Sequence, residues 1–211
     1  MGGKKRLPRH VREQQMLDAA VTMFASRGYA SASMDDIAEL AGVSKPMVYM
    51  YLHSKEDLFA ACVQREATAL KAAVAASIEE GLPPDRQLWR GLRAFFAHVA
   101  EHPDGWTMLR RQAHLAGEPV ASEVARMRDE MAGIVTGLIT DAAEAVTGGR
   151  PIAEQEVTGL AYALVGAAES LAEWASSVPD QAPKDTAGML MNLAWVGLSQ
   201  LMRGHSWPLD P

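Results

Sequence analysis

The side chains best suited to chemistry with another molecule lie on one short predicted helix, at about residues 45–51. Its outward positions carry a cation, amphipathic rings and thioethers, with no carboxylate: Lys45, Met47, Tyr49, Met50 and Tyr51. A helix of about seven residues is unstable by itself, so we expect its outward residues to serve something other than packing. A helix face with this chemistry suits insertion into the major groove of DNA.

Capping residues and one glycine predict the elements that hold this helix. Ser33 is suited to begin the preceding helix and forms a capping-box pattern with Asp36, three residues later. Gly42 supplies the left-handed residue that ends that helix. Ser44 is suited to begin the outward-facing helix. Two short helices around a tight turn, at about residues 33–52, form a predicted helix-turn-helix.

The outward-facing helix and the helix after it have favourable starts of their own. Pro46 lies near the beginning of the former, where a missing amide donor costs little. Ser54 and Asp57 repeat the capping-box pattern for a long helix that follows at once. This segment therefore predicts three helices in close succession.

Composition favours an all-α protein. Of the 211 residues 48% are hydrophobic and only 6% aromatic, and almost no segment alternates with period two. The single cysteine, Cys62, excludes an internal disulfide framework and fits a reducing compartment. No apolar run reaches the roughly 18–20 residues that span a bilayer, and the N-terminus lacks a signal-peptide core. We therefore expect a cytoplasmic protein with no membrane partner.

Charge is distributed unevenly along the chain. The formal net charge is −6, which taken alone argues against nucleic acid. Residues 1–53, however, carry seven Lys or Arg against five acids, and the first twelve residues hold five cations and no acid. A basic arm on an acidic body would keep DNA at one end of the molecule.

Helix breakers divide the chain into about nine helices with no repeat of fixed period. Apolar residues recur at helical spacing between the breakers, which predicts helices near 11–26, 34–41, 45–51, 54–80, 88–99, 106–109, 120–138, 157–178 and 186–203. This pattern predicts an all-α fold with its helix-turn-helix near the N-terminus.

Residues 12–59 resemble the TetR family of bacterial one-component regulators. The segment AGVSKPMVYMYLHSKEDL follows the signature of that family in order and spacing. The resemblance implies a three-helix DNA-binding domain joined to a helical ligand-binding and dimerisation domain, and repression as the usual role. We accordingly expect a basic disordered arm at 1–9, a DNA-binding domain at 10–53, and an effector-binding and dimerisation domain at 54–211.

The resemblance also assigns the DNA contacts. The predicted set is Ser33, Ser44, Lys45, Pro46, Met47, Tyr49, Tyr51 and Lys55. Lys45 can donate to guanine O6 or N7, whereas Tyr49 and Lys55 can hold phosphates and set register. Many relatives carry small or polar residues at Pro46 and Met47. Because Met47 cannot donate a hydrogen bond to a base, it would read a thymine methyl group or shape.

Two features predict a homodimer on a double-stranded operator with an inverted repeat. One recognition helix reads only a few base pairs, so specific binding requires two half-sites related by two-fold symmetry. The last two long helices also carry more apolar surface than a lone chain would bury. We expect a four-helix interface built from residues about 152–178 and 186–203 of each subunit.

A set of aromatic and methionine residues could line an apolar cavity between the middle helices. The candidates are Trp89, Phe96, Trp106, Met108, Met127, Met131 and Trp174. Methionine adapts to varied ligand shapes, so this composition predicts a hydrophobic small-molecule effector. No cofactor or metal ion is predicted.

Two alternatives remain open in the sequence. His98, Glu101 and His102 match the H-x-x-E-H pattern of inverted zinc peptidases, which would make the chain a metal-dependent hydrolase. Pro103 follows at once, however, and no third ligand stands at recognisable spacing. The second alternative is a regulator of the same fold that has no small-molecule ligand.

Overall fold

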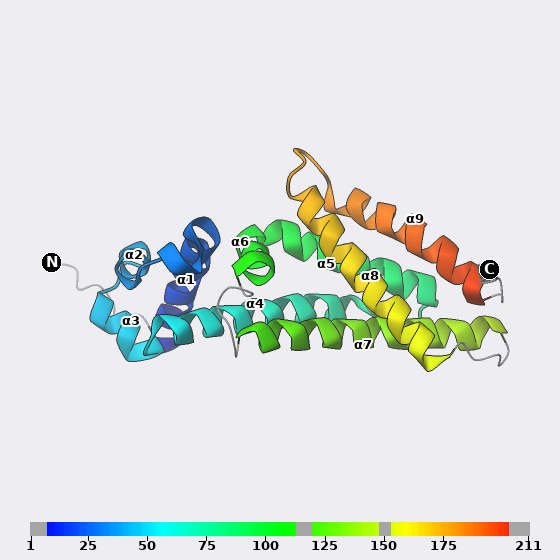
Figure 1. The fold of residues 1–211 in the computed structure, drawn as a ribbon, viewed down its shortest axis with the longest axis horizontal. Coiled ribbons are helices and arrows are strands. Elements are labelled where there is room, and N and C mark those ends of the chain that lie inside the picture. The colour runs from blue at the N-terminus through cyan, green and yellow to red at the C-terminus, as the bar shows by residue number, and fades with distance from the viewer. Residues whose placement is uncertain (1–7, 113–119, 148–152, 203–211) are drawn as a thin grey trace, which may run out of the picture. The chain divides into compact units, whose positions relative to one another are not determined.

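The computed structural model describes residues 8–112, 120–147 and 153–202, and nearly all of them are helical. Nine α-helices and one short π-helix occur there, and no strand is present in these ranges (Figure 1). In chain order they are α1 Arg9–Ser31, α2 Met34–Leu40, α3 Lys45–Leu52, α4 Lys55–Ser77, α5 Pro84–Glu101, α6 Pro103–Thr107, η1 Met108–Gln112, α7 Val120–Thr147, α8 Glu154–Ala175 and α9 Pro183–Met202. The predicted all-α class is therefore confirmed.

The described residues form two compact units. One unit takes its residues from 1–68 and 102–125, and the other takes them from 69–101 and 126–211. The predicted boundary between residues 53 and 54 divides the chain once, whereas each of these two units combines two separate segments of the chain. Of the predicted arm, residues 1–7 lie outside the described ranges, and Arg9 is already the first residue of α1.

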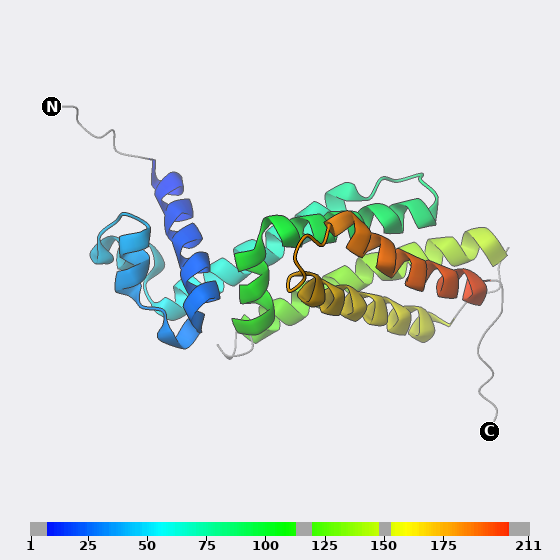
Figure 2. The ribbon, with the colours of Figure 1, turned by 90° about the horizontal axis from the view of Figure 1, so that it is seen from above.

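An apolar core joins the helices of the first unit. Phe24 of α1 packs edge to face on Phe59 of α4, with 4.9 Å between the ring centroids. Ile37 of α2 and Val48 of α3 are fully buried, as is Cys62 of α4. In this unit α2 lies against both α1 and α3 (Figure 2). This packing fixes α3, which is too short to be stable by itself.

The second unit is a bundle in which α9 packs against α5 and α8 (Figures 1 and 2). Leu88, Leu92 and Phe95 give α5 a buried face at helical spacing. Leu190 and Leu198 are buried on α9. Within the described residues, every helix is too short or too polar to cross a lipid bilayer.

The predicted end of the helix before Pro103 is confirmed, because α5 ends at Glu101. The sequence did not predict, however, that Pro103 begins another helix, α6, and that Gly105 lies within it. Proline is compatible with the first turn of a helix because the amide there has no intrahelical partner. Residues 106–109, predicted as one short helix, are divided between α6 and the π-helix η1.

Candidate nucleic-acid interface

The turn before α3 is built largely as its residue types predict. The Asp36 amide donates to Ser33 Oγ at 3.1 Å, which caps α2. The Asp36 carboxylate, however, pairs with Arg27 at 2.6 Å instead of completing the predicted capping box. Gly42 adopts φ 64°, and the amide of Val43 donates to the Ala38 carbonyl at 3.0 Å. These bonds close the turn that positions the start of α3.

Ser44 occupies the predicted N-cap position, but its side chain makes no capping hydrogen bond. Its carbonyl instead accepts from the Met47 amide at 2.9 Å, which begins the backbone ladder of α3. Pro46 lies at the start of the helix, as predicted. The start of α3 therefore depends on the backbone and the proline, and the Ser44 hydroxyl remains exposed for another contact.

The most exposed large apolar residue on the outer face of α3 is a methionine. Val48 and Leu52 point into the core, while the side of the helix away from them carries Met50, which is 63% exposed. Tyr49 is 40% exposed on one flank. The predicted contact set omits Met50, although its position half a turn from the buried Val48 could have indicated it. Of the other predicted contacts, Lys45 and Pro46 are exposed, and Met47 and Tyr51 are half-buried.

Lys45 is held by a carboxylate. Its ammonium donates to Asp35 Oδ2 of α2 at 2.8 Å, and both side chains are well exposed. The hydrogen bond to Asp35 raises the pKa of Lys45 above its ordinary value. In this structure the exposed Lys45 ammonium is therefore paired with a carboxylate of the neighbouring helix.

Lys55 and its neighbour Glu56 tie the start of α4 to the end of α1. Lys55 Nζ donates to the Ala30 carbonyl at 3.2 Å and lies 4.8 Å from the centre of the Tyr29 ring. The Tyr29 hydroxyl donates to Glu56 Oε1 at 3.0 Å. Burial, followed by this bond, raises the pKa of Tyr29. Ser54 completes the junction by accepting from the Asp57 amide at 2.9 Å, as predicted.

Two arginines of α1 reach the flank of α3 that faces away from Lys45. Arg12 Nη1 lies 3.4 Å from Met47 Sδ, and the guanidinium of Arg9 lies 5.1 Å from the centre of the Tyr51 ring. The sequence attributes both cations only to a basic stretch near the N-terminus. Their contact with α3 spans 35 residues of chain for Arg12, so no local pattern could have predicted it.

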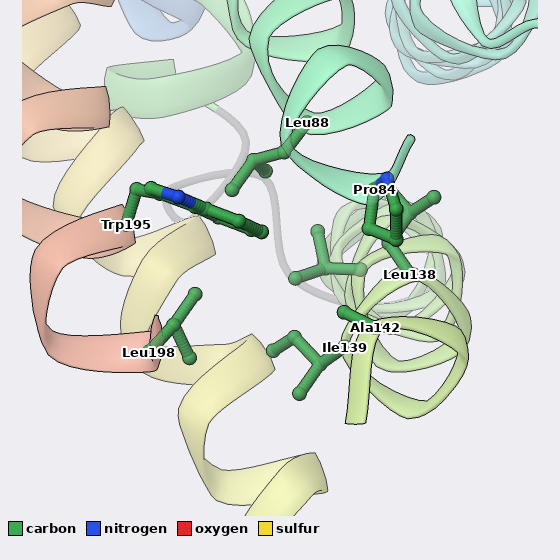
Figure 3. A pocket seen from close by; sticks show the side chains of 8 residues that line it. Pro84, Leu88, Leu138, Ile139, Ala142, Trp195 and Leu198 are labelled. Carbon is green, nitrogen blue, oxygen red and sulfur yellow. The ribbon is translucent and has the colours of Figure 1, made fainter. Parts of the chain in front are cut away.

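The second unit contains a small apolar cavity between α5, α7 and α9 (Figure 3). Its volume is about 10 Å³, and its lining residues are Pro84, Leu88, Val135, Leu138, Ile139, Ala142, Trp195 and Leu198. A space of that size is near the minimum for one water molecule. Trp195 of α9 and Leu138 of α7 approach it from opposite sides (Figure 3).

None of the seven residues predicted to line a ligand pocket lines this cavity. Trp106 and Met108 are buried in the first unit, and Phe96 and Met127 are buried in the second. Trp89 and Met131 are half-buried, and Trp174 is 43% exposed. The predicted set is therefore divided between two units, since residue type alone does not distinguish a pocket residue from a core residue.

The three residues of the zinc-peptidase pattern do not share one helix. α5 ends at Glu101, and His102 has φ −126° and ψ 57°, outside the helical region. Consequently His98 and His102 do not form a pair on one helical face. Across the described ranges, no group of three or more His, Cys, Asp or Glu side chains could hold a metal ion.

Exposed apolar side chains recur on one face of α9. Met189, Leu193 and Val196 are spaced by four and three residues, and Leu193 is 75% exposed. Tyr162 and Trp174 of α8 are also exposed. The rest of α9 packs on α5 and α8 within the same unit, so this apolar face lies on the outside of the described bundle.

Two short helices joined by a tight turn, with the second helix presenting an exposed face, are the arrangement of helix-turn-helix proteins. Residues 16–62 match the bacterial regulatory proteins of the tetR family, and residues 84–197 match the tetracyclin repressor-like C-terminal domain. A TetR-like transcriptional regulator from Rhodococcus sp. RHA1 is similar, at 38% identity and a TM-score of 0.78, over 92% of this chain and 99% of that chain. The chain belongs to the TetR family of bacterial regulatory proteins.

Two further proteins are similar to parts or to the fold of this chain. The transcriptional activator FasR of Mycolicibacterium smegmatis is 34% identical over 126 residues, which is 58% of each chain. AibR, crystallised with isovaleryl coenzyme A and operator DNA, has a TM-score of 0.70 at 19% identity and covers 86% of this chain and 97% of that chain. The match thus spans a little over half of FasR, and AibR shares the fold. Since the family consists of regulators, the hydrolase alternative is set aside.

Proposed function

We propose that this chain is a sequence-specific, DNA-binding transcriptional regulator that acts in the cytoplasm. The observation that carries the proposal is the outer face of α3, where Tyr49 and Met50 are exposed on a helix too short to fold alone. The predicted contacts Ser33, Ser44, Lys45, Pro46, Met47, Tyr49, Tyr51 and Lys55 remain the proposed DNA-binding set. Met50 is added to it because of its exposure.

The regulator acts as a homodimer on an operator with an inverted repeat. The apolar face of α9, with Met189, Leu193 and Val196, supports this proposal because an exposed apolar stripe on a bundle helix costs free energy in water. Exposed Tyr162 and Trp174 extend the same chemistry onto α8. All five of these residues lie within the two ranges, about 152–178 and 186–203, predicted from the sequence as the interface. Two copies joined there would present two copies of α3 to successive half-sites.

A hydrophobic small molecule controls DNA binding in this proposal. The cavity between α5, α7 and α9 is apolar but too small for such a ligand, so binding would require these helices to separate. AibR, which shares the fold, was crystallised with an acyl-coenzyme A and operator DNA. By linkage, an effector that releases DNA must bind the DNA-free form more tightly, typically by about 1–3 kcal/mol.

The direction of regulation is a separate question. Repression, relieved by the effector, is the role that the sequence resemblance implies, whereas the relative FasR is named an activator. We retain repression as the proposal. A reporter gene placed behind the bound duplex should be expressed less when this chain is present. Higher expression would make the chain an activator and leave the DNA-binding proposal intact.

The decisive experiment is selection of duplexes from a random-sequence library with the full chain. We expect recovery of an inverted repeat, bound at least about a thousandfold more tightly than random DNA. A chain that enriches no sequence above the library would contradict the proposed function. A thermal-shift screen with hydrophobic acids and acyl thioesters then tests the effector, since a ligand at 100 times its dissociation constant stabilises by about 2.7 kcal/mol. No shift with any of them would favour a regulator without a small-molecule ligand.

A further inference from the structure

The outer face of α3 offers few hydrogen-bond donors to a base. Pro46, Met47 and Met50 have no side-chain donor. The Lys45 ammonium donates to Asp35. Direct readout in the major groove depends on donors and acceptors that meet base edges. The donors that remain are the hydroxyls of Tyr49 and Tyr51 and the part of the Lys45 ammonium not used by Asp35, and none of these side chains has two donors in a fixed plane.

The guanidinium of Arg12, which belongs to α1, lies against this face of α3. Arg12 extends from α1 so that Nη1 lies 3.4 Å from the sulfur of Met47. A thioether is a weak acceptor, and a guanidinium carries five N–H donors in a fixed plane. Most of the donors of Arg12 are consequently still available after this contact.

Three other cations of this unit already have protein partners. Arg27 pairs with Asp36 at 2.6 Å, Lys45 pairs with Asp35, and Lys55 donates to the Ala30 carbonyl. In contrast, neither Arg9 nor Arg12 forms an ion pair with any carboxylate of the described chain. Arg9 is exposed over the Tyr51 ring, whereas Arg12 is half-buried against Met47 and so has a more defined position.

We propose that Arg12 is a specificity-determining residue of the DNA interface, supplying from α1 a coplanar pair of donors that no side chain of α3 carries. Its planar fork matches guanine O6 and N7, and the Met47 sulfur holds it at the edge of the reading face. The reading surface is then composite: α3 provides shape, methyl contacts and single donors, and α1 provides the paired donors of a guanidinium. This inference rests on the proposed function.

The test uses a duplex recovered from the random library by the wild-type chain, together with its single-base-pair variants. Dissociation constants are measured at one salt concentration for wild type, Arg12→Ala and Arg12→Lys. We expect Arg12→Ala to weaken binding to the selected duplex by about 5- to 150-fold and to lose discrimination at one base pair of each half-site. Arg12→Lys keeps the charge but not the fork, so it should lose the same discrimination.

The control variant is Arg86→Ala, which removes an exposed cation from α5 in the second unit. It should leave both affinity and discrimination unchanged. If Arg12→Ala weakens all duplexes equally and lowers the salt dependence by roughly one counterion, Arg12 contacts a phosphate and the inference is overturned. Unchanged binding overturns it too. Failure of the wild type to select any duplex would instead contradict the proposed function. If Arg12→Ala does not fold, Arg12→Lys still tests the inference, because it preserves bulk and charge and is expected to lose the same base-pair discrimination.

Discussion

The ammonium of Lys45, the first residue of α3, donates to the Asp35 carboxylate of α2 across 2.8 Å. One acidic side chain thus neutralises the lysine that the sequence assigns to base reading. DNA binding through Lys45 would have to compete with this ion pair. The arrangement lowers the electrostatic attraction of the interface for any DNA, regardless of its sequence.

Replacing Asp35 with asparagine should therefore strengthen non-specific DNA binding. The change removes a negative charge and frees Lys45 to neutralise a phosphate, so the slope of log K against log salt should steepen by roughly one unit. The measurement is a salt titration with a random-sequence duplex. Glu101→Gln, at the end of α5, is the matched control and should leave the slope unchanged. An unaltered slope in Asp35→Asn would show that Lys45 does not reach DNA.

Leu193→Glu should convert the proposed dimer into a monomer. Leu193 is 75% exposed at the centre of the apolar face of α9, and a dimer would bury the new carboxylate in both subunits without a partner. We expect the dimer dissociation constant to rise by roughly 100-fold or more. Lys184→Glu, also exposed on α9 but on its opposite side, is the control. Light scattering at micromolar concentration decides: a dimeric Leu193→Glu chain would contradict an interface on this face.

Gly105→Ala should destabilise the first unit. A Cβ at Gly105 would clash with the Glu66 carboxylate, and Glu66 is almost fully buried, with its carboxylate 2.8 Å from Arg65 Nη2. We expect a loss of about 1–3 kcal/mol in the free energy of unfolding, the usual range for overpacking.

Two further variants check this explanation in denaturant unfolding. Glu66→Asp withdraws the carboxylate by one methylene, so it should recover part of the loss when combined with Gly105→Ala. At Gly133 of α7 an added Cβ meets no atom within 4 Å, so Gly133→Ala should be neutral or stabilise by about 0.5–1 kcal/mol. A Gly105→Ala chain as stable as wild type would mean that Glu66 relaxes freely.

Cys62 should be inert in the folded protein. Burial raises the pKa of this thiol from 9.0 to about 12, so the folded chain keeps it protonated where the unfolded chain ionises it. At pH 8 a disulfide reagent should react only after unfolding. The free energy of unfolding should also fall, relative to Cys62→Ala, as the pH rises from 9 toward 12. Rapid labelling of Cys62 under native conditions would contradict its burial. So would a free energy of unfolding that changes with pH in the same way in wild type and in Cys62→Ala.

Local signals in the sequence were enough to predict most helices. Ser33, Gly42 and Ser54 act within three or four residues of chain, and each has the predicted backbone role. Pro103 follows the end of α5, as predicted, but it also begins α6, and residue type alone does not indicate that second role.

The candidate site was less predictable because its contacts are tertiary. Arg12 and Met47 are 35 residues apart, and nothing near either residue indicates the contact. Lys45 was expected to face DNA, but Asp35, brought close by the turn at Gly42, also satisfies its charge. The aromatic and methionine residues named as pocket candidates satisfy core packing equally well, and most of them are buried or half-buried.

The small size of the cavity between α5, α7 and α9 affects the effector concentration to which the protein would respond. If the ligand-competent form exists only when these helices part, the observed affinity equals the intrinsic affinity multiplied by the small fraction of open molecules. The packing of Leu138 and Trp195, which line this cavity, then helps to set the concentration at which a metabolite triggers a response. Substitutions that loosen this packing would lower that threshold without contacting the ligand, so sensitivity could be tuned in a different unit from the one that carries α3.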